Sequence, residues 1–243
     1  QDITKAPMSL LPGKEFFNNY QLALWKGSDN LGASAWTMMK NSLIMALGIS
    51  IGKIVISLLA SFAIVFFDFR LRKVIFWSIF ITLMLPVEVR IIPTYKVISD
   101  LHLLNSYWGL ILPMVVSATA VFLFRQFFMS VPREIAEASQ IDGATPMQFF
   151  VEILIPMTRT PIAAMFVIQY IYGWNQYLWP LLITTKEKYY TLLIGINRML
   201  VGADNAVQWN IVMATVMLAM LPPVIVVIVM QKQFVAGMTD TEK

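Results

Sequence analysis

Long apolar runs dominate this chain, and polar stretches separate them. Two of the runs, 161–183 and 207–230, carry no formal charge at all. A helix that crosses a bilayer needs about 20 predominantly apolar residues. The runs also lack the alternation of apolar and polar positions that marks the strands of membrane barrels. The pattern therefore predicts an all-α integral membrane protein with five transmembrane helices, at residues 41–67, 74–92, 107–124, 161–183 and 207–230.

The main polar interruption lies between the third and fourth spans, at residues 134–156. A charged stretch of this kind belongs in water, so the segment is expected to leave the membrane. Two short helices joined by a sharp turn would suit insertion into a groove on a partner protein. An ordinary solvated loop, whose charges need no partner, is the other interpretation.

Prolines and a glycine mark where these two short helices begin and end. Proline suits the first turn of a helix and does not suit its interior, and glycine readily takes a positive φ at a turn. Acidic side chains are also favourable near a helix N-terminus. The expected elements are a helix beginning at Pro132 with Glu134 and Glu137 near its start, a turn at Gly143, and a helix from Pro146 to about Leu154 that Pro156 ends.

Composition agrees with the membrane interpretation. Hydrophobic residues make up 58% of the chain and charged residues 13%, whereas soluble domains carry about 25% charged residues. Cysteine is absent, which excludes disulfides and thiolate metal sites, and a single histidine, His102, argues against a histidine metal site. The stretch from Gly48 to Ile54 departs from the phosphate-loop pattern and lies inside a predicted span, so no nucleotide site is expected.

Polar side chains inside the spans are candidates for a substrate pathway. A charge in mid-span costs at least about 2.5 kcal/mol unless it faces water, a partner or a pathway. Snorkelling or pairing with a partner subunit is the alternative role for Lys53, and a local ion pair with Glu88 is the alternative for Arg90. The uncharged residues can also form hydrogen bonds between helices. The candidates are Lys53, Arg90, Gln169, Tyr172, Asn175 and Gln176.

Charge alone does not fix the orientation in the membrane. Basic residues are shared almost equally between the two sides when alternate loops are assigned to opposite faces. The one tight cluster in a short loop, Arg70-Leu71-Arg72-Lys73, favours the cytoplasm for its own side. The segment 134–156 falls on that same side.

This segment also carries a motif, Glu137-Ala138-Ser139, then Gly143, then Ile153-Leu154-Ile155-Pro156. It resembles the loop with which membrane subunits of bacterial ATP-binding-cassette (ABC) importers dock onto their ATPases. Ser139 replaces the second alanine of that motif and Ile155 replaces leucine, both small changes in size. Asp142-Gly143-Ala144, together with the Trp174-Asn175 stretch within 172–182, is similar to the carbohydrate-uptake branch of the family.

The resemblance implies a type I ABC importer permease fold with six helices, the first of them before Gln1. Residues 6–12 resemble the extracytoplasmic segment that follows that helix, and a short amphipathic helix is expected around Glu15–Leu24. The implied organisation is an extracytoplasmic segment at 1–35, a permease domain at 36–232 that includes a cytoplasmic docking loop at 130–160, and a cytoplasmic tail at 233–243.

The resemblance further implies a non-catalytic subunit in the bacterial inner (cytoplasmic) membrane. Its partners would be a second, different permease subunit, two cytoplasmic ATPase subunits that bind ATP and Mg²⁺, and a periplasmic substrate-binding protein. No cofactor is expected in this chain, and no nucleic acid is expected among its partners. The residues implied in ATPase docking are Glu134, Glu137, Ala138, Ser139, Asp142, Gly143 and Ala144.

Three internal stretches and the terminal residues 237–243 are similar to the second permease subunits of sn-glycerol-3-phosphate importers. The internal stretches are 81–90, 117–129 and 172–182. The similarity implies import of sn-glycerol-3-phosphate or glycerophosphodiesters, and a phosphorylated substrate would give a reason for cations near the path. A neutral sugar such as maltose is the alternative substrate. A membrane-embedded lipid enzyme and a channel or carrier that works alone are alternatives from other classes.

Overall fold

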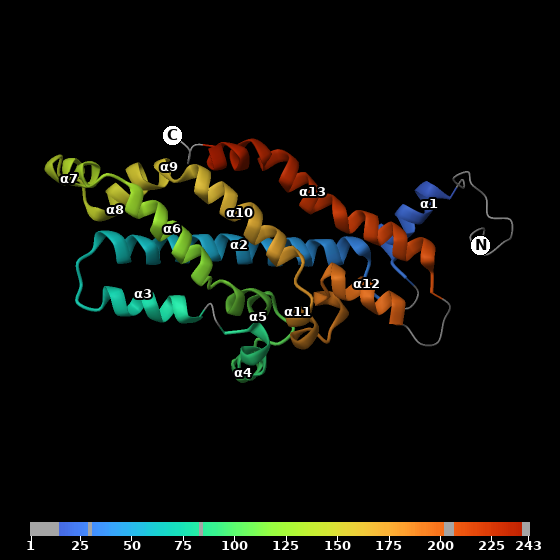
Figure 1. Cartoon of the computed structure of the whole chain (residues 1–243). Coiled ribbons are helices and arrows are strands. Elements are labelled where there is room, and N and C mark those ends of the chain that lie inside the picture. The colour runs from blue at the N-terminus through green and yellow to red at the C-terminus, as the bar shows by residue number, and fades with distance from the viewer. Residues whose placement is uncertain (1–14, 29–30, 83–84, 202–206, 240–243) are drawn as a thin grey trace. The chain divides into compact units, whose positions relative to one another are not determined.

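The computed structural model describes residues 15–28, 31–82, 85–201 and 207–239 (Figure 1). Every regular element in this part of the chain is helical, which confirms the predicted all-α fold. The chain forms two compact units, the first from residues 1–43 and 176–222 and the second from 44–175 and 223–243. Two long helices, α2 (Ala35–Phe66) and α13 (Trp209–Thr239), contribute residues to both units.

The first unit begins with a short helical segment, in agreement with the helix expected around residues 15–24. This segment is α1 (Phe16–Gln21) continued by η2 (Leu22–Lys26). The residues expected to follow a preceding helix, 6–12, lie outside the described part of the chain. The unit also contains the first turns of α2, most of the apolar part of α13, and the helices α11 (Leu178–Ile183), η6 (Glu187–Tyr189) and α12 (Leu192–Val201).

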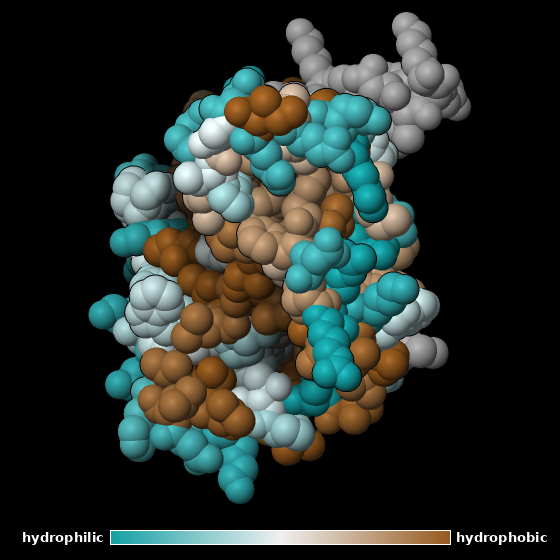
Figure 2. Space-filling view, turned by 90° about the vertical axis from the view of Figure 1, so that its left-hand side faces the viewer, coloured by the Kyte–Doolittle hydropathy of each residue, from teal (hydrophilic) through white to brown (hydrophobic). Residues whose placement is uncertain are grey.

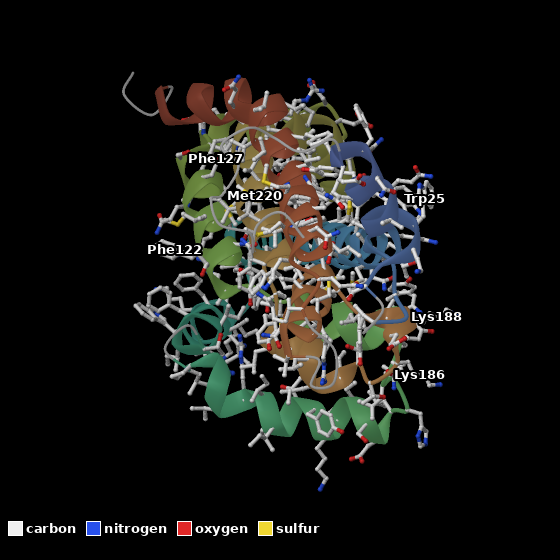
Figure 3. All side chains as sticks on the ribbon, turned by 90° about the vertical axis from the view of Figure 1, so that its right-hand side faces the viewer. Trp25, Phe122, Phe127, Lys186, Lys188 and Met220 are labelled. Carbon is white, nitrogen blue, oxygen red and sulfur yellow. The ribbon has the colours of Figure 1, made fainter. Side chains whose placement is uncertain are left out.

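Polar side chains at the start of α2 hold the segment around η6 in place. The Asn41 amide donates to the carbonyls of Lys188 and Tyr190, at 2.8 and 2.9 Å. The neighbouring Ser42 hydroxyl accepts from the backbone N–H of Leu192 at 2.8 Å, at the first turn of α12. Buried polar groups of this kind require partners. The side chains of Lys186 and Lys188 point outward from this segment (Figure 3).

The second unit contains most of the helices that bear on function. In chain order they are α3 (Arg72–Ile81), α4 (Val87–Asp100), α5 (Tyr107–Ile111), η4 (Leu112–Met114), α6 (Ala118–Ser130), α7 (Arg133–Ile141), α8 (Pro146–Gln148), η5 (Phe149–Leu154), α9 (Ile155–Met157) and α10 (Arg159–Trp174). Its core is rich in phenylalanine, because Phe62 of α2, Phe124 and Phe128 of α6, and Phe149 and Phe150 of η5 are all buried in one cluster. This cluster attaches the polar segment 134–156 to the apolar helices.

Small and hydroxylated residues allow α2 to approach its neighbours in the second unit. Ser61 donates to the carbonyl of Val121 in α6 at 2.9 Å. Gly173 of α10 packs so closely on α2 that an added Cβ would lie 2.9 Å from the Cα of Ala46. Small residues and interhelical hydrogen bonds are the usual means of association between helices in lipid.

The number of continuous membrane-spanning helices is smaller than predicted. Within the described residues, Ala35–Phe66 and Trp209–Gln231 are long and apolar enough to cross a membrane singly. Two further candidates are pairs of helices, Tyr107–Met114 with Ala118–Ser130, bent by 50°, and Pro146–Met157 with Arg159–Trp174, bent by 76°. Counting each bent pair as one span gives four.

The prediction of one continuous helix over 74–92 is wrong. Helix α3 ends at Ile81 and α4 begins at Val87, with Pro86 in an extended conformation between them. At 1.5 Å per residue, ten residues cover about 15 Å, half of the hydrocarbon core. The expected helix over 161–183 is likewise interrupted, because α10 ends at Trp174 and α11 begins at Leu178. The expected helix over 107–124 is bent near Ser117, whose side chain caps α6.

Candidate functional site

The segment predicted to dock onto ATPase subunits, residues 134–156, is called the docking segment. It begins inside a helix whose start agrees with the prediction. Pro132 occupies the N-cap position of α7, and Glu134 lies in its first turn. A carboxylate there is stabilised by the positive end of the helix dipole. Ile135 and Ala136 pack against the phenylalanine cluster of the second unit, so one face of α7 is fixed to the apolar helices.

The turn after α7 is held by two backbone hydrogen bonds. The N–H of Gly143 donates to the carbonyl of Gln140 at 3.0 Å, and the N–H of Ala144 donates to the carbonyl of Ser139 at 2.9 Å. Gly143 has a φ of +80°, as the predicted turn requires. This is the Schellman pattern that ends many helices, and it depends on a residue that takes the left-handed conformation without cost.

A capping box that the sequence analysis overlooked begins the second helix. The Thr145 hydroxyl accepts from the N–H of Gln148 at 3.3 Å, and the Gln148 side chain accepts from the N–H of Thr145 at 2.8 Å. The signal was present, since Thr145-Pro146-Met147-Gln148 fits the capping-box spacing with proline at the first helical position. The helix then continues to Met157, so the prediction that Pro156 ends it is wrong.

The predicted docking residues fall into two groups. Ser139 is buried and donates to the carbonyl of Ala136 at 3.2 Å, and Ala144 is half-buried. These two side chains are therefore less accessible to a partner than the others. The exposed group, which is accessible to a partner, comprises Glu134, Glu137, Ala138, Asp142 and Gly143.

Three apolar side chains on the same segment were missed by the sequence analysis. Ile141, at the end of α7, is 86% exposed, and Met147 and Val151 are also exposed. Single exposed apolar residues are normal on a protein surface, whereas several in one polar segment indicate a contact surface. The sequence does place an isoleucine directly before Asp142-Gly143, and a turn that only contacts water does not require an apolar residue there.

A polar cluster lies inside the apolar helices of the second unit. Lys53 of α2 is 6% exposed, and its ammonium donates to the Gln169 amide oxygen of α10 at 3.0 Å. The same ammonium lies 3.7 Å from the centre of the Tyr172 ring. The structure thus brings together three of the six predicted pathway residues. Within the described part of the chain, no carboxylate lies within ion-pair distance of Lys53.

The other predicted pathway residues are placed differently. Arg90 is exposed on α4. The side chain of Glu88 lies outside the described residues, so its pairing with Arg90 stays a prediction. Asn175 is exposed at the end of α10, and Gln176 belongs to the first unit.

Comparison with known families and proteins identifies the class to which this fold belongs. Residues 53–240 match the family described as "Binding-protein-dependent transport system inner membrane component". The chain belongs to this family, and it is a membrane subunit of an ABC importer rather than an enzyme. Such a subunit works with a second permease subunit, ATPase subunits and a binding protein, in the bacterial inner membrane.

Individual relatives make the likeness more specific. The chain is 56% identical over 243 residues to the "sn-glycerol-3-phosphate transport system permease protein UgpE" of Agrobacterium fabrum, covering 100% of this chain and 86% of the relative. It is 53% identical over 241 residues to the protein of that name from Salmonella typhi, covering 99% and 86%. A solved structure titled as a bacterial ABC transporter involved in the import of the acidic polysaccharide alginate matches with a TM-score of 0.81. That match has 22% identity and covers 96% of this chain and 85% of the other, so it supports the fold alone.

These findings decide between the classes that the sequence left open. A lipid enzyme and a channel or carrier that works alone are both set aside by membership of a binding-protein-dependent transport family.

Proposed function

We propose that this chain is the second permease subunit of an ATP-driven importer of sn-glycerol-3-phosphate or glycerophosphodiesters. The observation that carries the proposal is an identity of 51–56%, along almost the whole chain, to eight relatives that bear the sn-glycerol-3-phosphate permease name. A neutral sugar such as maltose is the alternative cargo.

The proposed assembly has five kinds of parts, of which this chain is one. A different permease subunit would pair with it as a heterodimer, and two cytoplasmic ATPase subunits would bind ATP and Mg²⁺. A periplasmic protein would deliver the substrate, and lipid would surround the helices. In this scheme no cofactor is held by the chain itself, and the segment 134–156 lies on the cytoplasmic side.

The docking segment would transmit ATPase closure to the membrane helices. Its turn is braced by the Schellman hydrogen bonds on one side of Gly143 and by the Thr145–Gln148 box on the other. Its buried face is anchored on the phenylalanine cluster through Ile135 and Phe149. A movement imposed on the exposed tip would therefore reach α2 and α6 through packed side chains. Little of that movement would be absorbed by bending of the segment itself.

The turn gives a prediction that separates backbone strain from steric clash. A Cβ at Gly143 would meet no atom within 4 Å, so Gly143→Ala changes only the cost of the positive φ. That cost is about 1–2 kcal/mol, and asparagine tolerates the conformation better. We expect Gly143→Ala to weaken binding of the ATPase subunit about 5- to 30-fold, measured by titrating that subunit onto the purified permease pair. Gly143→Asn should recover most of the affinity, and equal losses in both variants would contradict the strain argument.

The Lys53 cluster would contribute to the path of a phosphorylated substrate. Among the described residues no carboxylate pairs with the Lys53 ammonium, which lies among apolar helices and would attract an anion. Gln169 and Tyr172 would hold the ammonium in place, and both could bind glycerol hydroxyls when the substrate displaces them. Arg90, Asn175 and Gln176 are further path residues in this proposal because their side chains are polar.

The test of the substrate proposal is transport by the whole complex in proteoliposomes. With its own binding protein present, sn-glycerol-3-phosphate and glycerophosphocholine should each stimulate ATP hydrolysis and be taken up, and maltose should do neither. If maltose stimulates hydrolysis and the phosphorylated compounds do not, the substrate assignment is wrong while the family assignment stands.

A further inference from the structure

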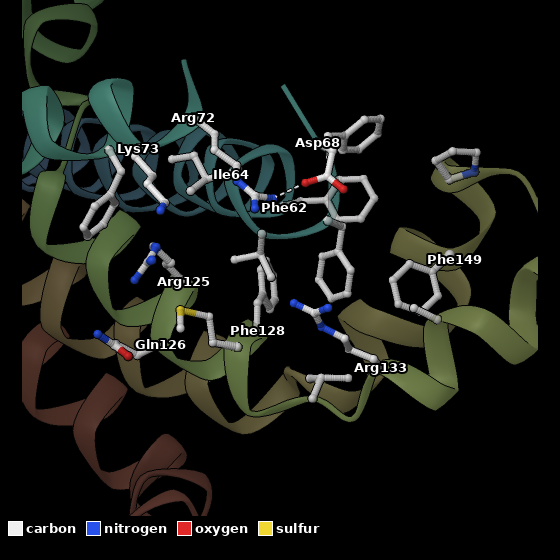
Figure 4. Close-up of a pocket in the computed structure, with 18 of the residues that line it drawn as sticks. Phe62, Ile64, Asp68, Arg72, Lys73, Arg125, Gln126, Phe128, Arg133 and Phe149 are labelled. Carbon is white, nitrogen blue, oxygen red and sulfur yellow. Dashed lines mark hydrogen bonds and ion pairs between the residues drawn. The ribbon is translucent and has the colours of Figure 1, made fainter. Parts of the chain in front are cut away.

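A large cavity lies beside the docking segment, and more basic than acidic side chains line it. The cavity has a volume of about 1170 Å³ and lies entirely within the second unit. It is bounded by the end of α2, the start of α3, the later part of α6, and the helices α7 and α8 (Figure 4). Four basic side chains from three helices line it, namely Arg72, Lys73, Arg125 and Arg133. We call it the basic cavity.

The basic side chains converge on a shared space. Figure 4 shows the ends of Lys73 and Arg125 pointing toward one another, and those of Arg72 and Arg133 pointing into the same cavity. Like charges brought together in this way disfavour one another unless an anion lies between them. The arrangement therefore favours the binding of an anion.

The acidic residues of the lining do not supply enough of it. Asp68 and Glu137 are the two carboxylates among the lining residues, which leaves an excess of two positive charges. Asp68 is paired with Arg72. Within the described part of the chain, neither Lys73 nor Arg133 forms an ion pair, and the buried Nε of Arg125 has no hydrogen-bond partner.

The start of α3 adds to this positive field. Arg72 and Lys73 occupy its first turn, where the helix dipole already disfavours cations. The N-cap residue, Leu71, has no side chain that can accept from the free N–H groups of that turn. A helix N-terminus bordered by basic side chains is suited to an anion, and especially to a phosphate.

An apolar wall adjoins the basic groups, and it distinguishes a lipid from a small ion. The Arg125 guanidinium lies 4.1 Å from the centre of the Phe76 ring, and Trp77 lines the cavity while remaining 57% exposed. Along α3, Val74, Ile75 and Ile81 are also exposed. Figure 2, which faces the end of the unit that carries α7, shows hydrophobic side chains in the middle of this face with hydrophilic ones around them. Inorganic phosphate would gain nothing from contact with an apolar wall, whereas acyl chains would be stabilised by packing against it.

We propose that the basic cavity binds the phosphate of an anionic phospholipid head group, with the acyl chains lying along the exposed apolar face of α3. Basic pockets between membrane helices are suited to such head groups. The lipid would join α3 and α6 to Arg133 of α7, and so to the docking segment. This last consequence, that anionic lipid supports coupling, rests on the proposed function, whereas the binding itself does not.

The test measures lipid retention by the whole complex, using nanodiscs of phosphatidylcholine with and without phosphatidylglycerol. Native mass spectrometry should find phosphatidylglycerol, and not phosphatidylcholine, retained on the released wild-type complex. Each basic residue near an anionic lipid contributes about fivefold in affinity, so Lys73→Gln with Arg125→Gln should weaken retention about 25-fold. The matched control is Arg70→Gln, which removes an exposed charge from the same loop outside the cavity and should leave retention unchanged.

Several outcomes would overturn the proposal. Equal retention by the wild-type and double-variant complexes would place the lipid elsewhere. If excess inorganic phosphate displaces the lipid, or reproduces its effect on ATP hydrolysis in phosphatidylcholine alone, the ligand is a free anion. Loss of the ATPase subunits from the double variant in every lipid composition would show that an ATPase surface fills the cavity. Should the double variant not fold, Lys73→Gln alone, at an exposed position, should lower retention about fivefold.

Failure of this proposal and failure of the proposed function are distinguishable. A wild-type complex that retains phosphatidylglycerol but does not respond to sn-glycerol-3-phosphate would support the lipid site and contradict the substrate assignment. The reverse result would contradict the lipid site alone.

Discussion

Replacing Ile141 by aspartate should detach the ATPase subunits from this transporter. Ile141 ends α7 beside the Gly143 turn, and 86% of its surface is exposed. An apolar side chain at the tip of a polar segment is suited to an apolar pocket on a partner. Truncating such an anchor typically costs at least about 2 kcal/mol, or roughly 30-fold in affinity. An aspartate would add the cost of burying a charge, so binding should fall by more than that.

The measurement is titration of the ATPase subunit onto the purified permease pair, supported by copurification of the assembled complex. Ile141→Leu should bind nearly as wild type, because it keeps the apolar volume. The matched control is Ile92→Asp on α4, where an isoleucine that is 75% exposed lies outside the docking segment. Normal ATPase binding by Ile141→Asp would show that the tip of α7 is not the anchor.

The docking segment was predictable because local chemistry determines it. Pro132, Gly143 and Pro146 act on their own backbone, and each lies where its conformational preference requires. The capping box of Thr145 and Gln148 is equally local and was simply overlooked. What the sequence does not state is which face of α7 is turned toward the phenylalanine cluster. The burial of Ser139 beside the exposure of Ile141 depends on that packing.

The membrane spans were only partly predictable from sequence patterns. Long apolar runs with few or no charges located α2 and α13 well, since a long apolar helix is their only stable form in lipid. Prolines were less informative. Pro222 and Pro223 stay inside α13, whereas Pro86 precedes α4 and separates it from α3. Whether a proline bends or ends a helix depends on the neighbouring helices that satisfy the freed carbonyls, and these are set by tertiary packing.

The Lys53 cluster was predictable in part, less fully than the docking segment. Gln169 and Tyr172 are three residues apart, so their common face on α10 follows from helical spacing. The hydrogen bond between Lys53 and Gln169 joins positions 116 residues apart in sequence, and it depends on the register between α2 and α10. The close approach of Gly173 to Ala46 fixes that register, and no single-sequence pattern reveals it.

Replacing Lys53 by methionine should change the stability of the complex and its transport activity to different extents. Lys53→Met removes an ammonium whose burial costs about 2.5–3.5 kcal/mol in a membrane span. It also removes the hydrogen bond to Gln169, leaving a buried amide oxygen at a cost of about 1–3 kcal/mol, and the contact with the Tyr172 ring, worth about 2 kcal/mol. These changes largely cancel, so the Tm of the complex should change little.

Uptake of sn-glycerol-3-phosphate by the Lys53→Met complex should nevertheless fall at least about tenfold, since a cation that attracts the substrate phosphate contributes 1.4 kcal/mol or more. Lys40→Met, at an exposed lysine of the same helix, is the matched control and should transport normally. Uptake and Tm are measured on the same preparations in proteoliposomes. A loss of uptake that follows a loss of Tm would make Lys53 a structural residue, and unchanged uptake would remove it from the pathway. Reduced uptake at an unchanged Tm would show that the Lys53 cation serves substrate transport rather than the stability of the fold.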